Sequence, residues 1–237
     1  MREHSVETAD GRALGIVEGG DPGGVPVLGL ETLAVWGISG GGPHALVCAA
    51  LLPKRVAAAA ALASVAPYPA DGLDWLAGMG EANVAEFQTA LRGREALEPL
   101  LAAEAEGLAS ASVEYVVAQL RSLLSPADAG VLTGELGAFL LESMRVGLAR
   151  GVDGWVDDDL AFTRPWGFDL AGIGVPLLLV HGAQDRFVPI AHGRWLAEKI
   201  PGVEARFIDE DGRITLAERR IPDVHAWLLA RAGEAER

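Results

Sequence analysis

Ser39 stands in the run Gly37-Ile38-Ser39-Gly40-Gly41, a G-x-S-x-G pattern between an apolar stretch and a segment of helical character. A strand, a tight turn and a helix in this order present a serine hydroxyl as a nucleophile. An unassisted hydroxyl attacks poorly, so it needs a base, a group that orients the base, and donors for the oxyanion. The pattern therefore predicts acyl-transfer chemistry at Ser39, provided that other segments supply these parts.

The segments around Ser39 predict a β-α-β unit. Residues 32–38 form a short apolar run typical of a strand buried on both faces. Residues 40–52 are helical in pattern and end at Pro53, and residues 56–65 form the next buried strand. Nearer the N-terminus, residues 5–8 and 13–17 read as two strands around an Asp10-Gly11 turn, and residues 25–30 as a further strand.

The remainder of the chain changes character twice. From residue 71 to about residue 150 the apolar spacing is helical, and Ser125-Pro126 predicts an N-cap followed by the first helical residue. Residues 151–174 are expected to form a linker anchored by aromatic side chains. Strands at 175–181 and 204–208 and helices at 191–200 and 216–230 then resume an α/β pattern. The fold class is therefore α/β with a helical insertion.

The composition of the chain disfavours several kinds of partner and cofactor. The chain has 237 residues, half of them apolar, and a net charge of −14, which disfavours nucleic acid and anionic membrane surfaces as partners. Cys48 is the only cysteine and is expected to be a small buried hydrophobe. With no signal-like segment, bilayer-length run or Cys/His metal spacing, we expect a cytoplasmic protein that binds a small molecule and uses no metal or cofactor.

Two segments resemble the α/β-hydrolase fold. Residues 37–41 resemble its nucleophile elbow, and V-H-G-A-Q-D-R-F-V-P at 180–189 resembles its acid-bearing loop. The resemblance implies a doubly wound, mostly parallel sheet, with a core at 1–67 and 151–237 and a helical cap at 68–150. It further implies a serine hydrolase of a small apolar ester, in which Ser39 attacks, Asp185 orients the base and the Gly40 amide donates to the oxyanion.

The position of the base departs from the family pattern. The resemblance places a histidine after the last strand, where this chain reads Asp211-Gly212-Arg213-Ile214-Thr215. Arg213 cannot accept a proton, because a guanidinium stays protonated above about pH 12, although it could pair with Asp185 or hold an anion. The sequence thus predicts impaired or absent hydrolysis. The alternative is a noncatalytic protein of this fold that binds a small ligand, or an inactive truncated product.

A second departure lies before the elbow. Parallel neighbouring strands need a crossover of at least about 10 residues, and Glu31 alone separates residues 25–30 from the next run. The resemblance implies an oxyanion loop, two helices and a strand in this interval, roughly 50 residues. We therefore expect residues 25–38 to be one extended segment, or the first run to be displaced, with the loop's oxyanion donor missing.

Other polar residues have ordinary structural interpretations. His181, at the end of a strand near Asp185, is the nearest alternative base, whereas His4, His44, His192 and His225 are expected to be structural. The run Asp157-Asp158-Asp159 could bind a cation, but we expect a solvated acidic loop.

Overall fold

A computed structural model describes residues 2–7, 13–18 and 32–235, and these fall into two compact units divided after Glu31. In the first unit, strands β1 (Arg2–Glu7) and β2 (Ala13–Glu18) pair antiparallel, with Arg2 opposite Glu18. The predicted hairpin is confirmed. Its Asp10-Gly11 turn and the run at 25–30 lie outside the described residues, as does the expected path of the chain into residue 32.

The second unit contains a parallel sheet that carries the serine motif. Its strands are β3 (Leu33–Ile38), β4 (Val56–Leu62), β5 (Leu177–Gly182) and β6 (Glu204–Ile208), in the order β3-β4-β5-β6. Helix α1 (Gly41–Leu51) connects β3 to β4, which confirms the predicted β-α-β unit. Within the described residues β3 is the edge of this sheet, and Leu33 and Trp36 on it remain more than a third exposed.

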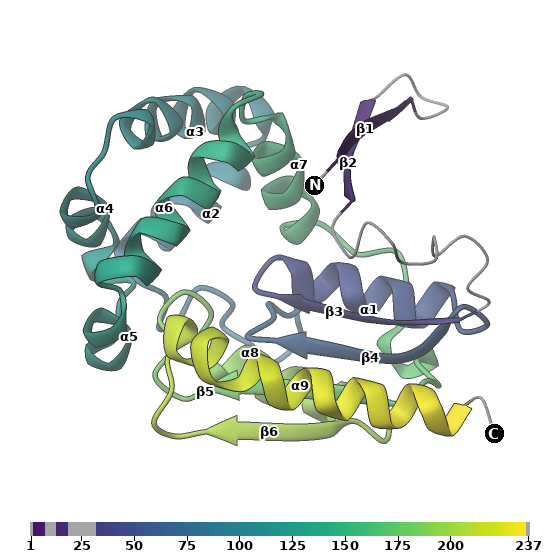
Figure 1. Cartoon of the computed structure of the whole chain (residues 1–237). Helices are drawn as coiled ribbons and strands as arrows, with labels where there is room; N and C mark the ends of the chain where they lie inside the picture. Colours follow the sequence, from purple (N-terminus) through teal and green to yellow (C-terminus); the bar gives the residue numbers. More distant parts are fainter. Residues whose placement is uncertain (1, 8–12, 19–31, 236–237) are drawn as a thin grey trace. The chain divides into compact units, whose positions relative to one another are not determined.

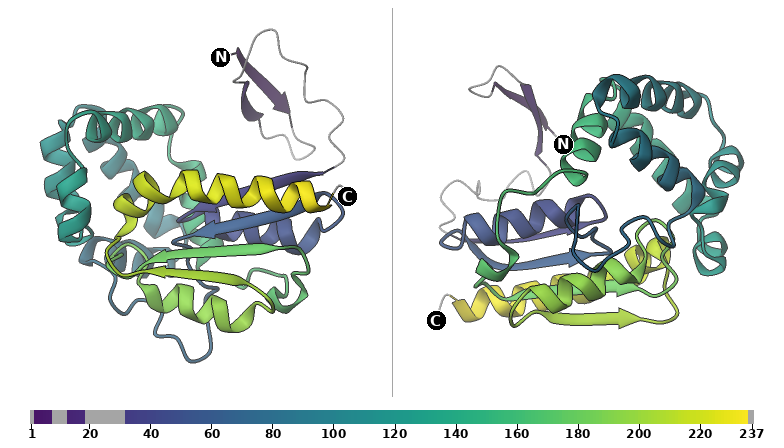
Figure 2. Two further views of the ribbon diagram at one scale, coloured as in Figure 1. Left: turned by 60° about the horizontal axis from the view of Figure 1, so that its bottom comes forward. Right: turned by 180° about the vertical axis from the view of Figure 1, so that it is seen from behind.

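Helices cover both faces of this sheet. The alternation of side chains along β4 sends Ala59 and Ala61 to the face packed by α1 and by α8 (Ile190–Lys199). Ala58 and Ala60 face the opposite layer, formed by α9 (Arg213–Ala235). Figure 2 shows α8 and α9 on opposite sides of the strands. Strand β4 is buried on both faces, so its sequence is a continuous apolar run and lacks the apolar-polar alternation typical of a half-exposed strand.

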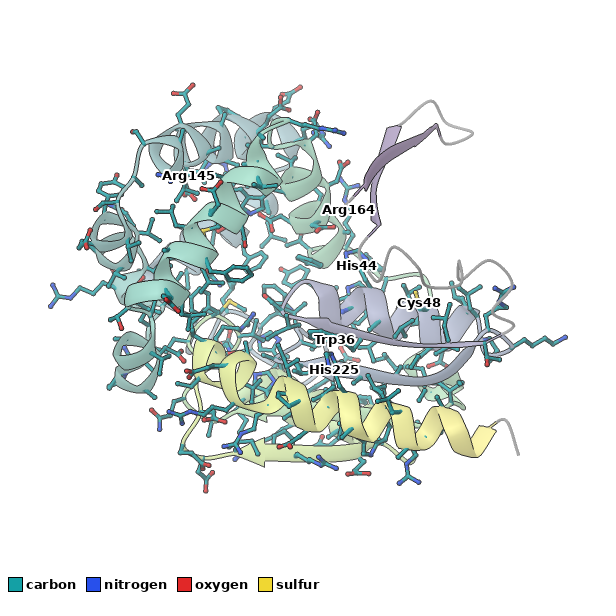
Figure 3. The ribbon with its side chains drawn as sticks, in the orientation of Figure 1. Trp36, His44, Cys48, Arg145, Arg164 and His225 are labelled. Carbon is teal, nitrogen blue, oxygen red and sulfur yellow. The ribbon has the colours of Figure 1, made fainter. Side chains whose placement is uncertain are left out.

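The long helix α9 also reaches the edge strand. The rings of Trp36 on β3 and His225 on α9 meet edge to face with centroids 5.3 Å apart (Figure 3). His225 thus has a packing role, as expected.

A block of helices lies beyond the carboxyl ends of the strands (Figure 1). It contains α2 (Glu81–Ala90), α3 (Arg94–Ala109), α4 (Val113–Gln119), α5 (Pro126–Val131) and α6 (Gly134–Leu148), with a short 3₁₀ helix at Leu120–Ser122. A second 3₁₀ helix, Leu170–Gly172, precedes β5 and packs beside α1. Ser125 caps α5 by accepting a hydrogen bond from the Asp128 amide, as the Ser-Pro pair predicted.

The prediction that residues 151–174 form a linker is wrong in part. These residues contain helix α7 (Asp153–Phe162), which packs against α2 and α3. The three consecutive aspartates therefore lie on a helix, and Asp159 is buried rather than solvated. Their run of like charge suggested a loop, but Val156 and Leu160 supply an apolar face that packs into the helical block.

Candidate active site

The serine motif forms a strained turn at the carboxyl end of β3. Ser39 has a φ of 59°, a left-handed conformation that is rare for residues other than glycine. A Cβ on Gly37 would lie 1.9 Å from the Gly41 carbonyl oxygen, and one on Gly42 would lie 2.3 Å from Ser64 Oγ. The Ser39 amide donates to the Leu62 carbonyl at 2.9 Å, which fastens the turn to β4. Glycine at 37 and 42 thus lets the backbone hold Ser39 in this conformation.

Asp185 lies in the loop after β5 with its carboxylate fully engaged. Its Oδ1 accepts hydrogen bonds from the amides of Phe187 and Val188 at 2.8 and 2.9 Å. Its Oδ2 accepts from Arg213 Nε at 2.9 Å, and both side chains are buried. The residue predicted to orient a base is therefore paired with a cation.

Arg213 opens helix α9 and reaches toward the serine turn. Its Nη2 donates to the Ala63 carbonyl at 3.3 Å, one residue beyond the Leu62 carbonyl that holds the Ser39 amide. Its guanidinium also lies over the Phe187 ring, 5.4 Å from the centroid. The structure thus brings Asp185 and Arg213 together beside the turn that carries Ser39. All the nitrogens of a guanidinium are donors, so this pair can orient charge but cannot remove a proton.

Asp128 is a neighbour of Arg213 that the sequence did not reveal. This fully buried carboxylate of α5 accepts from the backbone amides of Arg213, Ile214 and Thr215, each at 2.9 Å, and from Thr215 Oγ1 at 3.0 Å. The first amides of a helix have no partner within it, and their partial positive charge favours an anion. Asp128 therefore caps α9 from the helical block and fixes the backbone of Arg213. The only sequence signal was the Ser-x-x-Asp spacing from Ser125, which predicts a local cap.

The histidines of the described core make other contacts. His181 Nε2 bonds the Val188 carbonyl at 2.8 Å, and burial lowers the pKa of His181. His192 accepts from the Ala66 amide and donates to the Trp75 carbonyl, and burial lowers its pKa to about 4. His44 pairs with Asp158 at 3.1 Å near the Phe162 ring. The contacts described for these three histidines do not include Ser39, and the assignment of the base position to Arg213 stays a prediction.

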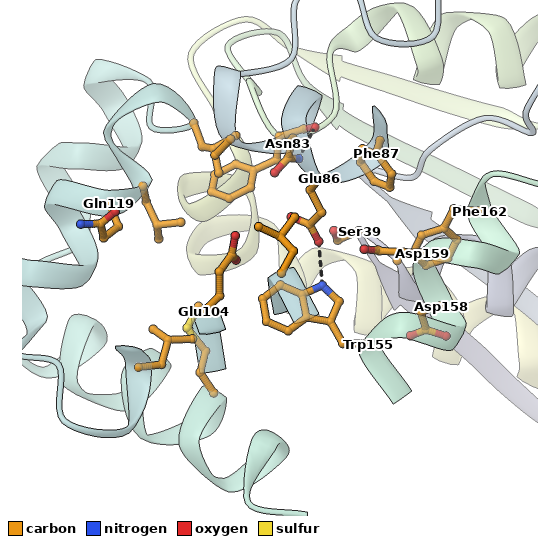
Figure 4. Close-up of a pocket in the computed structure, with 18 of the residues that line it drawn as sticks. Ser39, Asn83, Glu86, Phe87, Glu104, Gln119, Trp155, Asp158, Asp159 and Phe162 are labelled. Atoms are coloured by element: carbon orange, nitrogen blue, oxygen red, sulfur yellow. Dashed lines mark hydrogen bonds between the residues drawn. The ribbon is translucent and has the colours of Figure 1, made fainter. Parts of the chain in front are cut away.

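A cavity of about 650 Å³ lies between the serine turn and the helical block (Figure 4). Ser39 and Gly40 line it together with Phe187 and Val188, the residues that hold Asp185. Phe162 approaches Gly40 so closely that a Cβ there would lie 2.8 Å from the ring. A small molecule in this cavity would meet the serine hydroxyl and the amide at the start of α1.

Carboxyl groups line the helical side of the same cavity. Glu86 on α2 accepts a hydrogen bond from Trp155 Nε1 at 2.7 Å, and its carboxyl group is also a hydrogen-bond partner of Asp159 on α7. Burial, followed by the repulsion from Glu86, raises the pKa of Asp159 to about 9. Burial also raises the pKa values of Glu86 and Glu104. Sequence reasoning missed this cluster, because helices far apart in sequence bring its members together.

Several solved structures resemble this one. A bromoperoxidase from Bacillus anthracis aligns with a TM-score of 0.59 at 18% identity, over 85% of this chain and 68% of that protein. A thermophilic esterase from Thermogutta terrifontis aligns with a TM-score of 0.55 at 19% identity, over 85% of this chain and 66% of that protein. A bacterial membrane phospholipase A aligns with a TM-score of 0.55 at 20% identity, over 89% of this chain and 59% of that protein. No protein-family model matches the sequence, and no curated protein matches it.

The chain has the α/β-hydrolase fold. Within that fold, the assignments of Ser39 to a nucleophile elbow and of Asp185 to an acid loop stay predictions. The chain spans about two thirds or less of the length of these three proteins. Within the described residues, no helix is long and apolar enough to cross a membrane, and no cluster of side chains has the makeup of a metal site.

Proposed function

We propose that this chain is a serine-hydrolase-type protein that takes a small acyl compound, an ester or a close relative, into the cavity beside Ser39, with strongly impaired turnover. The observation that carries the proposal is the buried ion pair of Asp185 with Arg213, 2.9 Å apart. This pair lies beside the turn that carries Ser39, and its cation, Arg213, cannot act as a base. The net charge of −14 supports a small molecule rather than a nucleic acid as the ligand.

The size of the impairment follows from what the base contributes. In a comparable serine enzyme, loss of the triad histidine lowers turnover by roughly 10⁶, or about 8 kcal/mol of barrier. Arg213 supplies a positive charge near the turn, which could stabilise a developing oxyanion, but the Asp185 carboxylate already compensates that charge. Ser39 is therefore expected to react slowly, with a hydroxyl that no neighbouring base activates.

A second candidate is a noncatalytic binding protein of the same fold. The engagement of Asp185 by two backbone amides and Arg213 favours it, because the carboxylate that should orient a base is held by the Arg213 cation instead. In this case the cavity would hold a ligand without any covalent step at Ser39.

A fluorophosphonate probe separates the two candidates. If the proposal is correct, the probe attaches slowly to Ser39, identified by mass spectrometry of the labelled peptide, and the label disappears in Ser39→Ala. Arg213→His should accelerate labelling. A folded protein that takes no label in either the wild type or Arg213→His contradicts a nucleophilic role for Ser39 and supports the noncatalytic candidate.

A further inference from the structure

The charged residue types that line the cavity beside Ser39 are all acidic. Among its lining residues four are acidic, namely Glu86, Glu104, Asp158 and Asp159, and none is a lysine, arginine or histidine. Most of the remaining lining side chains are apolar or aromatic, including Phe87, Trp155 and Phe162. A carboxylate group within an aromatic wall is suited to a positively charged organic group, because both the carboxylates and the ring faces attract a cation.

One polar atom of this cluster lacks a partner. Asp159 is only 3% exposed, and its Oδ2 has no hydrogen-bond partner among the described residues. Figure 4 shows the Asp159 side chain directed toward the centre of the pocket, near Ser39 and Glu86. Buried polar atoms in proteins are nearly always hydrogen-bonded, so an unpartnered one that faces a cavity points to a ligand.

We infer that this cavity binds an organic cation, an ammonium group carried by a small and otherwise apolar molecule, between the carboxylates of Asp159 and Glu86 and beside Trp155. The inference deepens the proposed function, on which it rests, by naming the charge class of the acyl compound. The ammonium end would lie toward α2 and α7, and the acyl end toward Ser39 and Gly40.

Without a ligand, the carboxyl group of Asp159 holds a proton where the bound cation would lie. The pKa of Asp159, about 9, means that its carboxyl is neutral near pH 7. Nearby cations are engaged elsewhere, since Arg94 of α3 pairs with Asp157 and Asp153, and His44 of α1 pairs with Asp158. The groups that face Asp159 are Glu86 from α2, Glu104 from α3 and Asp158 from its own helix. A bound ammonium group would displace the proton, so its affinity should rise with pH.

Isothermal titration calorimetry of the full chain carrying Ser39→Ala tests this inference, because the substitution lets an ester bind without reacting. The probes are 5-aminopentyl acetate, whose ammonium group can donate to Asp159, and its uncharged isostere hexyl acetate, which share a shape and differ by one charge. At about pH 9 the cation should bind roughly ten-fold or more tightly than the uncharged ester. Its affinity should fall toward pH 6, and that of the uncharged ester should not change.

Matched variants identify the group responsible. Asp159→Asn and Glu86→Gln, each in the Ser39→Ala protein, should reduce the preference for the cation. Asp157→Asn should retain it, because Asp157 is exposed, pairs with Arg94 and does not line the cavity.

Three results would overturn the inference: no binding of 5-aminopentyl acetate, equal affinity for the two esters at pH 9, or an unchanged preference in both Asp159→Asn and Glu86→Gln. Fluorophosphonate labelling of Ser39 without a preference for the cation rejects this inference alone. A preference for the cation without labelling rejects the proposed nucleophilic role alone.

Discussion

Replacement of Arg213 by methionine should destabilise the protein substantially. The change retains most of the side-chain volume and removes the guanidinium, which leaves the buried Asp185 carboxylate without its cation. Breaking a buried ion pair from one side costs about 3–5 kcal/mol. The two amides that still donate to Oδ1 place the expected loss near the lower end, about 3 kcal/mol. For a chain of this size, that loss lowers Tm by roughly 6–12 °C.

Urea and thermal unfolding followed by circular dichroism measure this loss. Arg219→Met is the matched control on the same helix, because Arg219 is 43% exposed and shares its partner Asp211 with Arg220. It should cost less than about 1 kcal/mol. The double variant Asp185→Asn/Arg213→Met should recover much of the loss, since it removes both charges. A loss in Arg213→Met no larger than the control's, with no coupling to Asp185→Asn, would refute the assignment of this pair as a buried electrostatic unit.

Three further substitutions test other parts of the structure. Gly37→Ala should destabilise the fold by about 2 kcal/mol or more in urea unfolding, because the new Cβ would lie 1.9 Å from the Gly41 oxygen. Asp128→Ala should lower the free energy of unfolding by about 2–3 kcal/mol, because it leaves three amides of α9 without their acceptor. An unchanged midpoint of urea unfolding would show that this cap does not stabilise the fold. Asp159→Asn should stabilise the protein. The raised pKa of Asp159, about 9, makes wild-type stability fall as the pH rises from about 4 to about 9, so the advantage of the variant should grow across that range to a few kcal/mol. Parallel pH–stability curves for the two proteins would argue against a raised pKa.

The sequence predicted the elements near Ser39 well, because their signals are local. An apolar run, glycines around a serine and a helix ended by Pro53 each depend on neighbouring residues, and β3, α1 and β4 follow the predicted order. The catalytic roles of Ser39, Asp185 and Gly40 concern reactivity rather than position, so they stay predictions.

The misses came from tertiary packing. Helix α7 was hidden by three consecutive aspartates, whose charges obscured the spacing of Val156 and Leu160. Phe139 has the helical spacing of a packed residue, yet it is 66% exposed, because α6 packs through Gly137 and Leu141 instead. Such choices depend on which partner a helix meets, and no local pattern encodes that partner.

The carboxyl cluster and the α9 cap were beyond sequence reasoning for the same reason. Glu86 and Asp159 are separated by more than 70 positions, and Asp128 meets Arg213 from a different layer of the structure. Each looks like an ordinary surface acid until the fold buries it.

We propose that Ser39 is a correctly placed nucleophile that lacks a base, because Arg213 occupies the position of the base. The most direct test compares kcat/KM for p-nitrophenyl butyrate among the wild type, Arg213→His and Arg213→His/Ser39→Ala, with folding verified by circular dichroism. A positioned general base contributes roughly 10²-fold or more, so Arg213→His should raise kcat/KM by at least about that factor, and loss of Ser39 should abolish the gain. A folded Arg213→His protein with no gain in activity, or with a gain that survives Ser39→Ala, would contradict the claim.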